Sequence, residues 1–189
     1  MPPAAVLVPI KGFADAKGRL APALPAAERE TLARRLAAGV VGAAHAAALE
    51  VLVATDDDDV AAWARELGAS LVWTAGLDLN GSVAAGIDEA ARAGVPRVVV
   101  VHADIPSPGR LPDVARLPGT TLVPDRRDDG TNVLSLPAAC GFRVAYGPGS
   151  FHRHLREAHR VGAAGGVRVW REPGLGWDVD VPADLPSPA

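Results

Sequence analysis

Lysine is rare in this chain, and both copies, Lys11 and Lys17, lie with Arg19 in the segment after the first apolar run. The 19 basic residues are otherwise all arginine, and asparagine occurs only as Asn80 and Asn132. Lysine and arginine in a glycine-bearing loop are suited to binding phosphate oxygens. Solvated loop lysines are the alternative, since most lysines lie in water. The scarcity of lysine elsewhere favours the phosphate-binding interpretation.

Carboxylates follow two later extended segments. Asp104 comes just after the apolar run 97–102, while Asp178 and Asp180 alternate along an extended segment and so point to one side. Carboxylate oxygens in such positions are ligands that Mg²⁺ prefers. The alternatives are that Asp104 only turns the chain before Pro106, and that the other two are exposed loop acids. Carboxylates and cations in separate clusters suit a phosphate ligand bridged by Mg²⁺; the metal role is favoured for Asp104, while both interpretations stay open for Asp178 and Asp180.

Two glycine-bearing segments are candidate anion sites. The run Gly-Pro-Gly-Ser at 147–150 opens a predicted helix, and Gly-Thr-Asn at 130–132 lies in a loop. Backbone amides at such positions bind carboxylate or phosphate. An ordinary serine cap and an ordinary turn are the alternatives. Neither the dinucleotide-binding nor the P-loop glycine pattern is present.

Three other features are assigned no chemistry. The acidic run 56–59 is typical of solvation and helix capping. His152 and His154 lie about 200° apart on a helix, so they cannot share a metal ion. Cys140 lacks the context of a nucleophile and is expected to be a packed or exposed thiol.

These residues require a scaffold of alternating strands and helices. The predicted strands are 4–8, 50–55, 70–73, 97–102, 120–123, 132–136 and 167–171; the predicted helices begin at Pro25, near Val60, at Asn80 or Ser82, and at Ser150. Such alternation indicates one α/β domain over residues 1–189, with a doubly wound, mostly parallel sheet and helices on both faces. Ligands of such sheets bind beyond the carboxyl ends of the strands, where the charged residues lie.

Composition limits the function classes. The chain is 49% hydrophobic with mean hydropathy +0.15, which is enough for a full core. No apolar run reaches the roughly 20 residues of a membrane span, and the N-terminus does not resemble a signal peptide. One cysteine fits a reducing cytoplasm, and a net charge of −3 argues against nucleic-acid binding.

The ordered set of motifs resembles a known family, the 2-phospho-L-lactate and phosphoenolpyruvate guanylyltransferases of coenzyme F(420) biosynthesis. The matching segments are 8–11, 16–20, 79–80, 103–106, 124–126, 130–132, 146–151, 174–175 and 178–185, with Phe142 and His154. The resemblance implies a Rossmann-like fold similar to the sugar-nucleotide and molybdenum-cofactor nucleotidyltransferases. It implies GMP transfer from GTP to a phosphorylated three-carbon acid, with a deazaflavin transferase acting next.

The resemblance also implies residue roles. Lys11, Lys17 and Arg19 would bind the GTP phosphates and the transferring group, and Asn80 would help to read guanine. Mg²⁺ would be held by Asp104, Asp178 and Asp180. The phosphorylated acid would be held by Thr131, Gly147 and Ser150.

Two positions depart from the family pattern: Val181 stands where threonine is usual, and Gly81 where alanine is common. The accepted acid stays open among phosphoenolpyruvate, 2-phospho-L-lactate and 3-phospho-D-glycerate. A composition typical of a GC-rich bacterial genome favours phosphoenolpyruvate, which the actinobacterial members use. A different nucleotidyltransferase and a non-catalytic nucleotide sensor are the alternatives, and a homodimer is the default assembly.

Overall fold

Seven strands form one mixed sheet in the computed structural model, which describes residues 4–185. The strands are β1 (Ala5–Pro9), β2 (Glu50–Thr55), β3 (Ser70–Trp73), β4 (Arg97–Val101), β5 (Thr120–Pro124), β6 (Thr131–Pro137) and β7 (Val167–Val169). Their order is β3-β2-β1-β4-β6-β5-β7, and β6 alone runs antiparallel to its neighbours. The predicted mostly parallel sheet is therefore confirmed.

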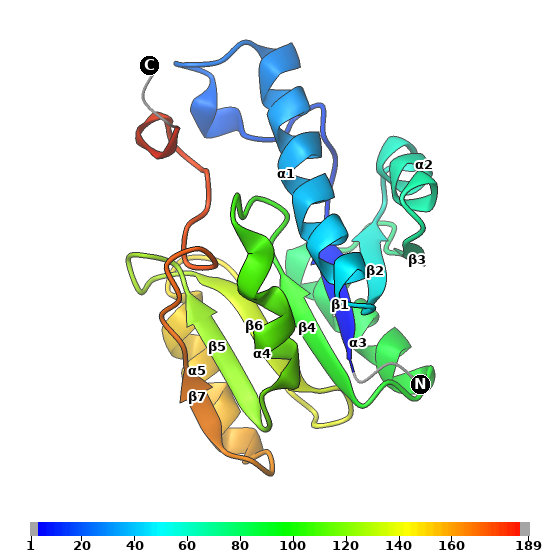
Figure 1. The fold of residues 1–189 in the computed structure, drawn as a ribbon, viewed down its shortest axis with the longest axis vertical. Coiled ribbons are helices and arrows are strands. Elements are labelled where there is room, and N and C mark those ends of the chain that lie inside the picture. The colour runs from blue at the N-terminus through cyan, green and yellow to red at the C-terminus, as the bar shows by residue number, and fades with distance from the viewer. Residues whose placement is uncertain (1–3, 186–189) are drawn as a thin grey trace.

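Helices cover both faces of the sheet (Figure 1). The helices are α1 (Ala26–Ala46), α2 (Asp58–Glu66), α3 (Leu79–Arg92), α4 (Leu111–Arg116) and α5 (Ser150–Val161). Buried residues of α1, α2 and α4 pack on one face, and those of α3 and α5 pack on the other. No helix of the described residues is long and apolar enough to cross a membrane.

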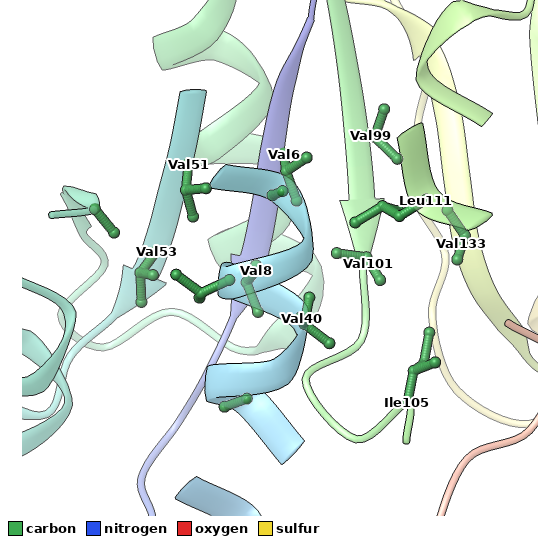
Figure 2. Close-up of a cluster of buried hydrophobic side chains, with 14 of the residues drawn as sticks. Val6, Val8, Val40, Val51, Val53, Val99, Val101, Ile105, Leu111 and Val133 are labelled. Atoms are coloured by element: carbon green, nitrogen blue, oxygen red, sulfur yellow. The ribbon is translucent and has the colours of Figure 1, made fainter. Parts of the chain in front are cut away.

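Alternation along the central strands builds the two cores. On β1, Val6 and Val8 belong to the core under α1, while Leu7 belongs to the core against α3. Because successive side chains of a strand point to opposite faces, an almost entirely apolar strand is suited to a sheet covered on both sides. Figure 2 shows the first core, in which β-branched side chains of neighbouring strands meet Val40 and Leu111.

The C-terminal segment makes a third, smaller cluster above the sheet. Val179 and the partly buried Leu185 pack against Leu20, Leu32 and Leu36. Figure 1 shows this segment rising beyond the carboxyl edge of the sheet to face the N-terminal half of α1. The cluster therefore fixes Asp178 and Asp180, on either side of Val179, near that edge.

Local signals explain where the helix boundaries differ from the sequence predictions. Helix α3 begins at Leu79, because the Asp78 side chain accepts the Gly81 amide at 2.8 Å; the prediction that Asn80 or Ser82 opens it is wrong. Helix α4 was not predicted. It is only six residues long and carries Pro112 in its first turn, so it offers little periodicity to detect.

We expect Gly119→Ala to destabilise the fold by about 3 kcal/mol, from a positive φ combined with overpacking. Gly119 has φ 74°, and an added Cβ would lie 2.1 Å from the Gly166 carbonyl oxygen, which accepts the Thr120 amide. The measurement is urea unfolding.

The matched control for Gly119→Ala is Gly39→Ala in the interior of α1, where an added Cβ meets nothing within 4 Å. Alanine there is expected to stabilise the chain by about 0.5–1 kcal/mol. A Gly119→Ala protein as stable as the wild type would contradict the close packing of these two glycine segments.

Candidate active site

A cleft of about 250 Å³ lies beyond the carboxyl ends of β1 and β4. Its lining includes Ile10, Phe13, Lys17, Leu79, His102 and Asp104. These two strands are neighbours in the sheet although β2 and β3 intervene in the sequence. Strand β1 therefore has β2 on one side and β4 on the other, and the connections that follow β1 and β4 leave in opposite directions. Such a position is a topological switch point, where α/β sheets bind ligands.

Lys17 and Asp104 meet in this cleft. The Lys17 Nζ lies 2.6 Å from Asp104 Oδ2, and the two side chains are 9% and 23% exposed. The other carboxylate oxygen, Oδ1, is buried and has no hydrogen-bond partner. Lys17 itself has φ 58°, a left-handed conformation that costs roughly 1–2 kcal/mol outside glycine. Strained backbone and an unsatisfied buried oxygen are features of a binding site.

Lys11 lies beside a second, smaller cavity of about 150 Å³, which Thr55 and Ser82 also line. Its Nζ is 3.0 Å from Asp56 Oδ2 and also donates to the Leu77 carbonyl oxygen. The hydrogen bond from Lys11 lowers the pKa of Asp56, so this carboxylate stays ionised at neutral pH. Both predicted phosphate-binding lysines are therefore paired with carboxylates at strand ends.

Asp178 lies close to Asp104. The Val179 amide donates to the Asp104 carbonyl oxygen at 3.2 Å, and Asn132 Nδ2 lies 3.5 Å from Asp178 Oδ1. Burial raises the pKa of Asp178, and the neighbouring Asp104 carboxylate raises it further. Two close carboxylates, one with an unpartnered buried oxygen, are a donor set that fits a hard cation such as Mg²⁺.

Asp180 is engaged elsewhere. Its Oδ2 lies 2.6 Å from Arg19 Nη1, and its backbone amide donates to the buried Asp184 at 2.8 Å. Within residues 4–185, no three His, Cys, Asp or Glu side chains come together in a way that suits a metal ion. The structure thus brings Asp104 and Asp178 together but leaves Asp180 with Arg19, and the three-ligand site stays a prediction.

Asn80 bonds the backbone of the 145–149 loop. Its Oδ1 accepts the Tyr146 amide at 2.6 Å, and its Nδ2 lies 3.4 Å from the Tyr146 carbonyl oxygen. Because Leu79 lines the cleft, Asn80 connects this loop to the cleft wall. A role in reading guanine stays a prediction, since both ends of the amide are occupied here.

The glycine-rich start of α5 is satisfied from within the chain. The Gly149 amide donates to Asp129 Oδ1 at 3.1 Å, and the Phe151 amide donates to the Asp129 carbonyl oxygen at 2.9 Å. The Ser150 amide donates to the Gly147 carbonyl oxygen at 3.0 Å, and the Ser150 side chain is buried. A ligand held by these amides would have to replace Asp129. Binding of the phosphorylated acid by Gly147 and Ser150 therefore stays a prediction.

Thr131 is fully buried, and its hydroxyl lies 3.0 Å from His154 Nδ1. The other ring nitrogen, Nε2, accepts the Ala145 amide at 2.8 Å. An accepting Nε2 carries no proton, so the hydrogen-bond network assigns the proton to Nδ1, which donates to Thr131. Burial lowers the pKa of His154 to about 4, and Arg153 adds to this effect. The imidazole is therefore neutral at physiological pH.

This lowered pKa predicts a pH dependence of stability. The pKa of His154 is about 4 in the folded chain and about 6.5 in the unfolded chain, so the unfolded state binds the extra proton. Stability is full above pH 6.5 and falls as the pH drops toward 4. Between pH 7 and pH 5 the expected loss is about 2 kcal/mol relative to His154→Phe, measured by urea unfolding. Equal losses in both proteins would contradict the lowered pKa.

Sequence reasoning overlooked two residues that shape the site, Asp56 and His102. The acidic run does cap α2, since Asp57 accepts the Val60 amide at 2.9 Å, but Asp56 pairs with Lys11. His102 lines the cleft, and its ring lies 5.3 Å from that of Tyr146. The position of His102 and Asp56 at the carboxyl ends of strands is the signal that could have identified them.

The fold, with this cleft at the switch point of its sheet, is that of the solved nucleotidyltransferases. A solved nucleotidyl transferase from Methanothermobacter thermautotrophicus superposes with a TM-score of 0.62 at 16% identity, covering 96% of this chain and 93% of that chain. The family model described as "Guanylyl transferase CofC like" matches residues 4–186. The chain therefore belongs to the CofC family of guanylyl transferases.

Two relatives illustrate the range of the family. The phosphoenolpyruvate guanylyltransferase of Sphaerobacter thermophilus is 37% identical over 186 residues, which cover 95% of this chain and 89% of the relative. The 2-phospho-L-lactate guanylyltransferase of Methanothermobacter thermautotrophicus is 33% identical over 186 residues, which cover 95% and 81%. The resemblance inferred from the sequence motifs is confirmed.

Proposed function

We propose that this chain transfers GMP from GTP to the phosphate of phosphoenolpyruvate, with 2-phospho-L-lactate as the second candidate acceptor. Family membership and the names of the relatives support guanylyl transfer, and the first of these two relatives supports phosphoenolpyruvate. The observation that carries the proposal is the partly buried contact of Lys17 with Asp104 at the switch point of the sheet. This contact supports the proposal because Lys17 would bind a phosphate oxygen beside the carboxylate that would hold Mg²⁺.

The chemistry needs little from the protein beyond position and charge. A phosphate monoester is largely a dianion at pH 7, so its oxygen attacks the α-phosphorus of GTP without a general base. The new bond joins the acceptor oxygen to this phosphorus, and the bond to the bridging oxygen of the β-phosphate breaks, so pyrophosphate leaves. Catalysis then consists of in-line positioning and neutralisation of the developing charge.

The paired cations supply that neutralisation. Lys11, Lys17 and Arg19 each contact a carboxylate at 2.6–3.0 Å, and triphosphate oxygens would take the place of those carboxylates. Release from Lys17 and Arg19 would free Asp104 and Asp180 to hold Mg²⁺ together with Asp178. Bound there, Mg²⁺ would offset negative charge on the α-phosphate and on pyrophosphate.

The acceptor half of the site is assigned to the 145–149 loop and the start of β6. Thr131, Gly147 and Ser150 would hold the phosphorylated acid, and Asn80 would stand between this half and the nucleotide. The activated product then requires a transferase that attaches it to a deazaflavin acceptor. We place these steps in the cytoplasm.

The test is pyrophosphate release from GTP and Mg²⁺ with phosphoenolpyruvate or 2-phospho-L-lactate supplied separately. A downstream deazaflavin transferase and its acceptor are included to trap the unstable product. Turnover with one acid would fix both reaction and substrate. No turnover with either acid, despite measurable GTP binding, would contradict the proposal and favour another phosphate acceptor or a nucleotide sensor.

A further inference from the structure

The 145–149 loop is held by three side chains from two helices. Asn80 of α3 bonds both the amide and the carbonyl group of Tyr146. Arg153 of α5 donates to the Ala145 carbonyl oxygen at 2.9 and 3.1 Å and also to that of Pro148. His154 accepts the amide of Ala145. The loop is therefore built in one conformation, with glycine at 147 and 149 allowing positive φ.

His154 differs from Asn80 and Arg153 because it contacts strand β6 as well as the 145–149 loop. Its Nδ1 lies 3.0 Å from the Thr131 hydroxyl at the start of β6, and its Nε2 lies 2.8 Å from the Ala145 nitrogen. The side chain is fully buried, and its ring packs edge-on against Tyr146 with centroids 4.7 Å apart. Both polar atoms of a buried imidazole are thus used to join two segments that are distant in sequence.

The hydrogen bonds of His154 set the geometry between two segments as well as filling space. An apolar side chain would fill the same space between Tyr146 and Phe142, but it would leave the buried Thr131 hydroxyl and the Ala145 amide without this partner. Asn80 and Arg153 also bond the loop, so the loop does not depend on His154 alone. Of these three side chains, only His154 also bonds Thr131, so it is the one that fixes Thr131 relative to the loop.

We propose that His154 is the positioning residue of the acceptor half of the site: it fixes the start of β6 relative to the 145–149 loop, so that their groups converge on the phosphorylated acid. This inference rests on the proposed function, because it takes Thr131 and Gly147 as acceptor-binding residues. It assigns His154 no contact with the nucleotide, which Lys11 and Lys17 bind beyond the ends of other strands.

The test compares His154→Phe, His154→Gln and, as matched control, His159→Phe on the exposed face of the same helix. Loss of two hydrogen bonds in His154→Phe is expected to raise the KM for phosphoenolpyruvate about tenfold to a hundredfold. The KM and the calorimetric Kd for GTP should stay within about twofold of the wild type, since Lys11, Lys17 and Arg19, which would bind GTP, are untouched. Gln retains an acceptor for the Ala145 amide, so its KM should be intermediate, and His159→Phe should match the wild type.

Two results would overturn the inference. An unchanged KM for phosphoenolpyruvate in both His154 variants would remove the positioning role. Parallel losses of GTP and phosphoenolpyruvate binding would show that the residue serves the whole fold instead. If His154→Phe does not fold, as judged by circular dichroism, the Gln variant decides by the same comparison.

The wild-type protein separates this inference from the proposed function. A wild type that neither binds nor turns over either phospho-acid contradicts the proposed function, and the positioning role falls with it. A wild type that turns over phosphoenolpyruvate, with His154 variants that do so at the same KM, overturns the positioning role alone.

Discussion

Asp104→Asn is expected to lower kcat/KM for guanylyl transfer by at least about 10²–10³-fold while leaving the fold intact. The amide nearly matches the carboxylate in shape and still accepts a hydrogen bond from Lys17, which lies 2.6 Å from Oδ2. It lacks the negative charge by which a carboxylate binds Mg²⁺ more strongly than a neutral oxygen does. Steady-state pyrophosphate release, together with circular dichroism, measures the effect.

The matched control for Asp104→Asn is Asp113→Asn on α4, whose carboxylate pairs with the exposed Arg110 and Arg116. Surface ion pairs contribute little, so this variant should keep wild-type activity. Asp104→Asn with near-normal turnover would remove Asp104 from the metal-binding proposal. Calorimetric titration with Mg²⁺ in the presence of a non-hydrolysable GTP analogue gives a second measure, in which the Asp104 variant should bind the ion more weakly.

Lys17→Met is expected to reduce kcat/KM for GTP by about 10²–10³-fold. Methionine keeps most of the apolar stem of a side chain that is only 9% exposed, but removes the ammonium group beside Asp104. The left-handed backbone at φ 58° is strained equally by both residues, so the variant isolates the charge. Initial rates over a range of GTP concentrations measure the effect.

Lys17→Arg provides the graded comparison for Lys17→Met. It restores the positive charge with a longer, planar group, and partial recovery of activity is expected. The KM for phosphoenolpyruvate should change less than kcat, because Lys17 lies in the nucleotide half of the cleft. Activity of Lys17→Met close to that of the wild type would show that this lysine is paired only for structural reasons.

Much of the fold could be predicted because its strands are unusually apolar. Residues 98–101 are buried on both faces within β4, which ends one residue before the predicted run 97–102, and β2 and β3 have the predicted bounds. Strand order could not be predicted in the same way, since pairings such as β1 with β4 join residues more than 90 positions apart. Nothing in the local pattern marks β6 as antiparallel.

The rare residue types proved more informative than the alternation of acids. Lys11, Lys17, Asn80 and Asn132 all make defined contacts at the carboxyl edge of the sheet: two ion pairs, the bonds to Tyr146, and a bond to the Leu175 carbonyl oxygen. The spacing of Asp178 and Asp180 predicted a shared cation, whereas Arg19 neutralises the second of them here. Spacing along an extended segment does not reveal which cations reach it from elsewhere.

His154 shows why helical geometry alone is an incomplete guide to polar residues. The angle between His152 and His154 correctly separates them: one is exposed and the other is buried in the core. The angle does not reveal that Thr131 and the Ala145 amide lie on the buried side, because both come from other parts of the chain. Buried polar networks of this kind depend on tertiary contacts.

The measurement that tests the central claim most directly follows the phosphorus atoms of GTP. GTP labelled at the α-phosphate or at the γ-phosphate is incubated with the protein, Mg²⁺, phosphoenolpyruvate and no trap, and the products are separated promptly. Guanylyl transfer predicts that the α-label joins the phosphorylated acid while the γ-label leaves in pyrophosphate. Appearance of the γ-label on the acid, or of GDP and free phosphate, would show that a different bond of GTP is broken and would contradict the account.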